Sequence, residues 1–380
     1  MGLLPGNRVE LLCDGDETLP AMFAAMRRAR RYVHLEYYVF EDVQCEGETL
    51  GELLLERRAA GVQIAVIYDA VGSAHTPPVF LETLRRAGVR LLRFGPLNPL
   101  VARRGWSPNR RDHRKILIVD GTVAIVGGVN LSSSYEMPLS SRAGVHARDA
   151  TCSWRDTDLL LEGPAIAQLQ RLFLEHWAEQ GGNHLPQAEI RPVPDRPGQE
   201  RVGIIGSAPA YGRPDYYNAL LAALRGAQSR VWITAGYFLP TAEQNAALID
   251  AARRQVDVQL VLPSRNDSTA ALAVQRFGYV RLLKAGVRIY EREGVILHSK
   301  SVIVDASWCA VGSSNFDKRS VRFNDEVDVV VVGTRTANAL ARLFLADIRR
   351  ARLIDAGGWE RRPWRQRGLE LFWKPWENLL

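Results

Sequence analysis

Two stretches of the chain carry the same reactive side chains at the same spacing. In the first stretch, His113 and Lys115 stand two residues apart, Asp120 lies five residues after the lysine, and Asn130 follows a pair of glycines. The second stretch repeats each of these intervals in the other half of the chain. Its members are His298, Lys300, Asp305 and Asn315. One such match is compatible with chance, but two matches in register indicate an internal duplication built around these residues.

The histidine and lysine of each stretch are suited to chemistry on a phosphodiester. They lie on an apolar run typical of a strand, where residues two apart leave the same face. The ammonium group would neutralise phosphate oxygens, and the imidazole would attack phosphorus or protonate a leaving oxygen. The amides of Asn130 and Asn315 would donate to the same oxygens, and the nearby glycines would let the backbone come close. A single strand histidine is more often a core residue, but its duplication beside a lysine favours catalysis.

Two acidic residues are candidates for orienting the imidazoles. A nucleophilic histidine usually needs a carboxylate on its second ring nitrogen. The segment that begins at Asp156 aligns without gaps on the segment that begins at Glu326, and we expect both residues to be orienting carboxylates. Asp120 and Asp305 complete the repeated catalytic motif. They lie at the far end of each strand, where we expect a structural role through backbone amides or a basic side chain.

The predicted elements around the two stretches repeat as well. Apolar periodicity predicts helices over 21–31, 48–60 and 78–87 and strands over 32–40, 62–68 and 89–94. The second half repeats this order, with strands over 230–238 and 256–262 around a helix over 242–254. The alternation predicts an α/β fold of two similar lobes, with mixed sheets flanked by helices. The predicted units are a first lobe over 1–181, a Pro- and Gly-rich linker over 182–200, a second lobe over 201–350 and a tail over 351–380.

Composition limits the possible partners and locations. The 380 residues carry a net charge of +7, which favours an anionic partner such as phospholipid headgroups, nucleic acid or phosphorylated small molecules. The four cysteines are scattered, so neither a zinc cage nor a disulfide framework is indicated. No run approaches the roughly 18 apolar residues of a membrane-spanning helix. With no signal-peptide pattern at the N-terminus, we expect the cytoplasm or the cytoplasmic face of a membrane.

The duplicated motif resembles the His-x-Lys-x4-Asp signature of the phospholipase D superfamily. The resemblance covers nearly the whole chain and is most specific for bacterial cardiolipin synthases, notably the shorter type without N-terminal membrane helices. The segments that carry it are 34–40, 126–130, 154–157, 162–164 and 315–320, together with Asn324 and Glu326. The chain departs from the usual pattern at Phe316, Gly236 and Asp158, which bears on substrate choice more than on activity.

The resemblance implies a two-lobed fold with both histidines at the interface between the lobes and with no metal or other cofactor. It also implies a phosphohistidine intermediate, with His113 as the nucleophile and His298 as the acid. The near symmetry of the repeat leaves these two roles interchangeable on the residues alone. The implied substrates are phospholipids: two phosphatidylglycerol molecules would give cardiolipin and glycerol. Phosphatidylethanolamine as donor, or another alcohol as acceptor, stays open.

The tail combines tryptophan with basic residues. Its tryptophans are Trp359, Trp364, Trp373 and Trp376. This composition favours the headgroup layer of an anionic membrane, and we expect a peripheral protein on the cytoplasmic face of the cell membrane. A C-terminal helix packed on its own core is an equally good interpretation.

Two other functions of the whole chain compete with lipid synthesis. One is a phosphodiesterase or nuclease of the same superfamily, although nucleic acid is not the expected partner. The other is a catalytically inactive membrane-binding module.

Overall fold

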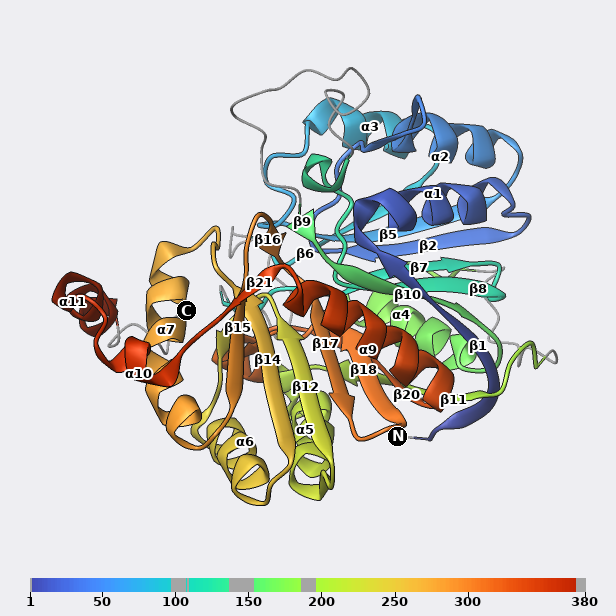
Figure 1. Ribbon diagram of the computed structural model, residues 1–380. Helices are drawn as coiled ribbons and strands as arrows, with labels where there is room; N and C mark the ends of the chain where they lie inside the picture. Colours follow the sequence, from blue (N-terminus) through green and yellow to red (C-terminus); the bar gives the residue numbers. More distant parts are fainter. Residues whose placement is uncertain (1, 97–106, 108, 137–153, 186–195, 374–380) are drawn as a thin grey trace.

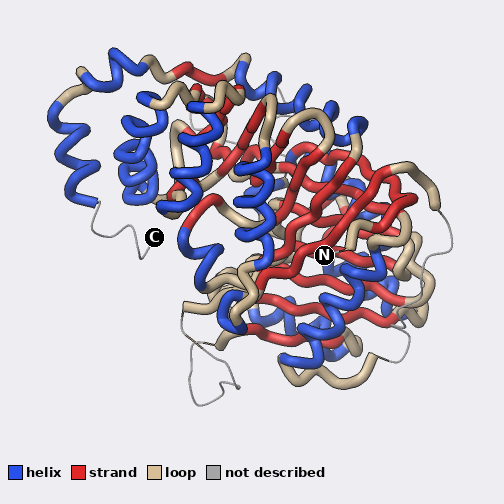
Figure 2. The backbone as a smooth tube through the Cα atoms, turned by 90° about the horizontal axis from the view of Figure 1, so that it is seen from below, coloured by secondary structure: helices blue, strands red, loops and turns tan. Residues whose placement is uncertain are grey.

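The computed structural model describes residues 2–96, 107, 109–136, 154–185 and 196–373 (Figure 1). Within these residues the main feature is one mixed sheet of fifteen strands. Its order is β21-β15-β14-β12-β17-β18-β20-β11-β1-β10-β8-β7-β2-β5-β6. Seen from below in Figure 2, the strands run through the middle of the molecule and helices lie on either side of them.

The first half of the chain supplies seven strands of this sheet. They are β1 (Leu4–Cys13), β2 (Tyr32–Tyr37), β5 (Gln63–Asp69), β6 (Arg90–Phe94), β7 (Lys115–Val119), β8 (Val123–Gly127) and β10 (Thr157–Glu162). The strands β2, β5 and β6 are parallel neighbours, so helices must connect them, whereas β7, β8 and β10 pair antiparallel. The helices of this half are α1 (Asp14–Arg27), α2 (Leu50–Ala59), α3 (Pro78–Arg86) and α4 (Ile166–Glu179).

The second half repeats this arrangement. Its strands are β11 (Glu200–Ser207), β12 (Arg230–Ala235), β14 (Asp257–Pro263), β15 (Arg288–Arg292), β17 (Lys300–Val304), β18 (Trp308–Gly312), β20 (Glu326–Val332) and the added edge strand β21 (Ala351–Leu353). Its main helices are α5 (Asp215–Gly226), α6 (Ala242–Arg253), α7 (Thr269–Lys284) and α9 (Thr334–Ile348). Read outward from the centre of the sheet, the two halves have the same strand order, which confirms the predicted duplicated α/β fold.

The two halves are joined by a sheet contact and by a shared core. Strands β1 and β11 pair antiparallel at the centre, with a register shift between Leu4 and Asn7. One apolar cluster contains residues of both halves, including Ile116 and Phe173 from the first and Val329 from the second. The halves therefore pack against each other along buried surface. The predicted domain boundaries stay predictions, and much of the predicted linker lies outside the described residues.

After the edge strand β21, the C-terminal tail forms two short helices at the edge of the second half. They are α10 (Ala356–Glu360) and α11 (Trp364–Trp373), and Trp376 lies outside the described residues. Trp359 is buried against Tyr279 of α7, with 5.2 Å between the ring centroids, whereas Trp364 is 77% exposed. In the described part of the chain, no helix has both the length and the apolar composition needed to cross a bilayer.

Candidate active site

Each repeated motif is held against the other half of the chain. The backbone N–H of His113 donates to the carbonyl of Asp325, 2.9 Å away, just before β20. Reciprocally, the N–H of His298 donates to the carbonyl of Arg155 at 2.8 Å, where β9 (Trp154–Arg155) pairs with β16 (Ile296–Leu297). The residues that follow Asp325 and Arg155 are the two predicted orienting carboxylates. Each motif therefore lies beside the carboxylate of the opposite half.

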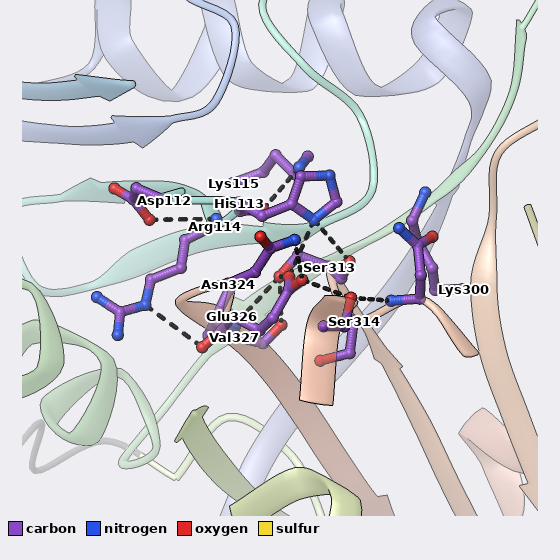
Figure 3. Close-up of polar contacts among 12 residues, drawn as sticks. Asp112, His113, Arg114, Lys115, Lys300, Ser313, Ser314, Asn324, Glu326 and Val327 are labelled. Atoms are coloured by element: carbon purple, nitrogen blue, oxygen red, sulfur yellow. Dashed lines mark hydrogen bonds and ion pairs between the residues drawn. The ribbon is translucent and has the colours of Figure 1, made fainter. Parts of the chain in front are cut away.

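The first imidazole contacts a carboxylate and a carbonyl from the second half. His113 Nδ1 lies 3.0 Å from Glu326 Oε2 and 3.1 Å from the carbonyl oxygen of Ser313 (Figure 3). Both neighbours only accept hydrogen bonds, so Nδ1 carries the proton of the neutral ring and Nε2 keeps a lone pair. Burial lowers the pKa of His113, although Glu326 opposes this shift. The ring is therefore neutral near pH 7, as a nucleophile must be.

The second imidazole has the corresponding contact with the first half. His298 Nδ1 lies 2.7 Å from Asp156 Oδ2 and 3.1 Å from the hydroxyl of Tyr135, which itself donates to Asp156 Oδ2 at 2.8 Å. Burial and the neighbouring Lys300 lower the pKa of His298 to about 4. Burial alone would raise the pKa of the Asp156 carboxyl, but Lys300 and His298 together hold it well below its usual range. Asp156 is thus a carboxylate, able to stabilise a protonated His298.

The two lysines place positive charge in the same region. Lys115 Nζ donates to the carbonyl of its own His113 at 2.6 Å, and Lys300 Nζ donates to the carbonyl of His298. Burial lowers the pKa of Lys115 to about 7, an effect that Lys300 increases and Glu326 opposes. Burial also lowers the pKa of Lys300 to about 8. An anion bound between the two ammonium groups would favour their charged forms, so the region is suited to a phosphate.

The predicted phosphate-binding asparagines flank this region. Asn130 Oδ1 accepts from the backbone N–H of Val39 at 3.3 Å, and its side chain also bonds to Tyr135. Asn315 Oδ1 is buried and has no hydrogen-bond partner among the described residues. These observations do not test whether the two side-chain amides donate to a phosphate, and that role stays a prediction.

The glycines of the two turns admit buried carboxylates close to the backbone. A side chain at Gly128 would overlap Asp156, and one at Gly127 would overlap Asp158. At Gly236, an added Cβ would lie 2.7 Å from the Cα of His298. These positions lack a side chain because the carboxylates and the second motif occupy the space. We expected the glycines of both turns to let the backbone come close to a phosphate; the side chains that Gly127, Gly128 and Gly312 adjoin in the structure are Asp158, Asp156 and Asp328.

Aromatic rings surround both imidazoles, and these were not among the residues predicted for the site. Tyr38 meets the ring of His113 edge-on, with 5.3 Å between centroids. Trp154 and Tyr237 lie 4.9 Å and 6.5 Å from the ring of His298. The three rings form an aromatic wall beside imidazole residues that are only 8% (His113) and 7% (His298) exposed.

The polar residues that hold the carboxylates were missed as well, although the repeat contains a signal for two of them. Tyr135 and Ser320 each lie five residues after a predicted asparagine. Both bond to the carboxylate of their own half: Tyr135 to Asp156, and Ser320 Oγ to Glu326 Oε1 at 2.8 Å. Glu326 also accepts from Ser313 Oγ at 2.5 Å. Their equal spacing is the signal for this pair. It was missed because one copy has a tyrosine where the other has a serine.

The motif aspartates lie away from the imidazoles, where they bind backbone amides. Asp120 accepts from the N–H groups of Arg30, Arg31 and Tyr32 at 2.7–2.8 Å. Asp305 binds the equivalent backbone of the second half, accepting from residues 228–230. The expected backbone-amide contacts are present, and each aspartate ties the end of a motif strand to the start of the neighbouring strand.

Replacing Asp120 by alanine is expected to lower the free energy of unfolding by about 1–3 kcal/mol, because three backbone donors lose their acceptor. Turnover per folded molecule should be nearly unchanged, since the carboxylate does not touch the imidazoles. Urea unfolding and activity at low temperature would measure both effects. Asp250→Ala, at an exposed helix position, is the control. A loss of turnover in the fully folded Asp120→Ala protein would contradict the structural role.

Among the described residues, one group has the composition of a metal site. It consists of Glu36, Asp112 and His176, whose candidate ligand atoms lie within 4.8 Å of one another. Arg114 Nη1 already lies 3.0 Å from Glu36 Oε1, and His176 Nδ1 lies 2.8 Å from the same oxygen. The guanidinium would repel a divalent cation at this position. The group fits a buried ion-pair network beside the first motif better than it fits a metal site.

Comparison with known proteins gives the family of the chain. The family model described as "Cardiolipin synthase, PLD-like domain" matches residues 22–177 and 220–348. A cardiolipin synthase of Geobacillus kaustophilus is 34% identical over 364 residues, covering 95% of this chain and 70% of the relative. Cardiolipin synthase A of Pseudomonas aeruginosa is 36% identical over 344 residues, covering 90% of this chain and 67% of the relative.

Solved structures agree on the fold. The phosphatidylserine synthase of Haemophilus influenzae superposes with a TM-score of 0.72 at 12% identity, covering all of this chain and 94% of that one. A polyphosphate kinase of Porphyromonas gingivalis gives a TM-score of 0.59, also at 12% identity, with 98% of this chain and 54% of the other covered. At this level of identity the similarity concerns the duplicated fold alone.

Proposed function

Because the chain belongs to the cardiolipin synthase family of phospholipase D-type phosphatidyltransferases, we propose that it makes cardiolipin from two phosphatidylglycerol molecules, with release of glycerol. The observation that carries the proposal is the crossed arrangement, in which Glu326 contacts His113 and Asp156 contacts His298. It supports one site made by both halves, with two imidazoles and two lysines available to a single phosphodiester.

In the proposed first step, Nε2 of His113 attacks the phosphorus of one phosphatidylglycerol. His298 enters this step protonated, because Asp156 and the bound phosphodiester anion oppose the lowering of its pKa by burial and Lys300. The bond from phosphorus to the glycerol headgroup oxygen breaks, and that oxygen takes the proton from Nε2 of His298. Lys115 and Lys300 neutralise the phosphate oxygens, and the bound anion keeps both lysines charged. The products of this step are free glycerol, a phosphatidyl group on His113 and a neutral His298.

In the proposed second step, a hydroxyl of another phosphatidylglycerol displaces His113. His298 accepts the proton of that hydroxyl while its oxygen bonds to phosphorus and the phosphorus–nitrogen bond breaks. Cardiolipin leaves, and both imidazoles return to their first state. Transfer exceeds hydrolysis only where water is held off, and the aromatic wall of Tyr38, Trp154 and Tyr237 supports this preference.

The proposed partner surface is an anionic membrane, and the proposed location is the cytoplasmic face of the cell membrane, with the protein attached peripherally. The net charge of +7 supports attraction to such a surface. The phosphodiester site is also compatible with phosphatidylethanolamine as donor, so the donor is part of the test.

Purified protein incubated with phosphatidylglycerol vesicles is expected to form one glycerol per cardiolipin, measured by mass spectrometry of the lipids and enzymatic assay of glycerol. A mixture with phosphatidylethanolamine reports the donor, because that donor releases ethanolamine. A parallel incubation with DNA is expected to leave the DNA intact. Formation of phosphatidic acid alone, or cleavage of DNA, would overturn the proposal in favour of a phosphodiesterase.

A further inference from the structure

The C-terminal helix α11 has two different faces. Trp364, Leu371 and Phe372 are 77%, 60% and 65% exposed, and they fall on one side of the helix because they are spaced by seven and eight residues. Arg367 is exposed on the same side. Large apolar side chains at this exposure cost free energy in water, so the outer face is expected to meet an apolar phase.

The inner face of α11 is fixed to the body of the protein. Glu370 is 1% exposed and forms an ion pair with Arg362, whose guanidinium also lies 4.9 Å from the ring of the buried Trp359. Trp373 packs on a small apolar cluster at α7 that includes Val274. Figure 1 shows α11 at the outer edge of the molecule, beside α7. The exposed residues are therefore held outward on an anchored helix.

The anchored face adjoins the active site. Tyr237 packs against the same small cluster as Trp373, and its ring lies 6.5 Å from the ring of His298. Tyr237 and the cluster of Leu239, Ala271 and Val274 thus lie between the base of α11 and the second imidazole. A surface that bound a membrane here would place the headgroup layer next to the site.

We propose that the outer face of α11, defined by Trp364, Arg367, Leu371 and Phe372, inserts into the interfacial layer of an anionic phospholipid bilayer and presents lipid headgroups to the site beside Tyr237. Tryptophan and phenylalanine favour this layer, and the exposed Arg361 and Arg367 match its negative charge. A purely protein partner would not need the cationic residues interleaved with the aromatic ones. The inference deepens the proposed function and rests on a lipid substrate.

The test is a triple variant, Trp364→Ser, Leu371→Ser and Phe372→Ser, in the full chain. Its binding to phosphatidylglycerol/phosphatidylcholine vesicles, measured by sedimentation, is expected to be at least about tenfold weaker than that of the unmodified protein. Val79→Ser, at a 73% exposed position on α3, is the matched control and should bind normally. Arg361→Glu with Arg367→Glu should weaken binding to anionic vesicles and leave binding to neutral vesicles unchanged.

Turnover of a short-chain, water-soluble phosphatidylglycerol separates the surface from the site. The triple variant is expected to keep this turnover and to lose turnover on vesicles. Unchanged sedimentation of the triple variant with vesicles would overturn the inference. It would also be overturned if the unmodified protein were a dimer and the triple variant a monomer that still binds vesicles, because a second copy of the chain would then be the partner of this face. If the unmodified protein turned over neither substrate while the triple variant lost vesicle binding, the proposed function would fail and the membrane face would stand.

Discussion

His113→Ala is expected to lower cardiolipin formation by at least about 10⁴-fold, because it removes the imidazole that forms the covalent intermediate in the proposed mechanism. His298→Ala should also abolish product from phosphatidylglycerol, whose glycerol oxygen is a poor leaving group without a proton. The two variants should differ on a phosphatidyl ester of p-nitrophenol, which leaves without an acid. There, His298→Ala is expected to release about one nitrophenol per site and then stop, and His113→Ala none.

Nitrophenol release in a stopped-flow experiment, together with mass spectrometry of the labelled enzyme, would measure this difference. His75→Ala, at an exposed position, is the control for loss of an imidazole and should behave as the unmodified protein does. A nitrophenol burst from His113→Ala and none from His298→Ala would reverse the two roles. Normal turnover by either variant would remove the two-histidine mechanism.

Glu326→Gln is expected to lower the rate of the first step by about 10²–10⁴-fold, since the amide keeps the shape of the carboxylate and loses the charge that fixes the tautomer of His113. Asp156→Asn should reduce cardiolipin formation by a similar factor through His298. With the nitrophenyl substrate the two effects separate: Glu326→Gln should slow the burst, whereas Asp156→Asn should leave it intact. Burst rates and overall turnover measure the two effects.

The burst assay also tests which carboxylate serves which imidazole. The structure pairs Glu326 with His113 across the two halves, so a slow burst in Asp156→Asn and a normal one in Glu326→Gln would contradict the crossed pairing. Tyr135→Phe is the matched variant for the hydroxyl that bonds to Asp156 and should show a smaller loss than Asp156→Asn. Thermal unfolding of each variant controls for general damage, because these carboxylates are buried.

The sequence by itself determined the duplicated fold and the types of residue at its centre. Spacing was sufficient to predict both, because equal intervals between the same residue types in two segments reveal a duplication. Strand periodicity then puts each histidine and its lysine on one face of a strand. For the aspartates, the distance along the strand from the histidines led us to expect backbone amides or a basic side chain as partners, and the structure places backbone N–H groups beside both carboxylates. The repeat and the strand faces depend on residue spacing within short segments, and such spacing can be read directly from a sequence.

Element boundaries were predicted less well where a residue contradicts the pattern. The helix predicted over 21–31 spans Asp14–Arg27, because acidic residues in its first turn favour an earlier start and Pro20 is accommodated within it. Strand β1, at the centre of the sheet, was not predicted, since Pro5 and Gly6 interrupt its period. Its partners, β10 and β11, lie more than a hundred residues away, so only the folded chain could reveal the pairing.

Only the tertiary structure decided which carboxylate contacts which histidine, and which rings enclose the pair. Asp156 and His298 are 142 residues apart, and Glu326 and His113 are 213 apart. Their contact follows from the packing of the two halves around a shared core, which no local interval encodes. The same holds for Trp154, which lies beside His298 because β9 of the first half pairs with β16 of the second, and for Tyr237, which follows β12 where it pairs with β17. Sequence spacing specifies the parts of such a site, and the burial of surface between distant segments specifies how they meet.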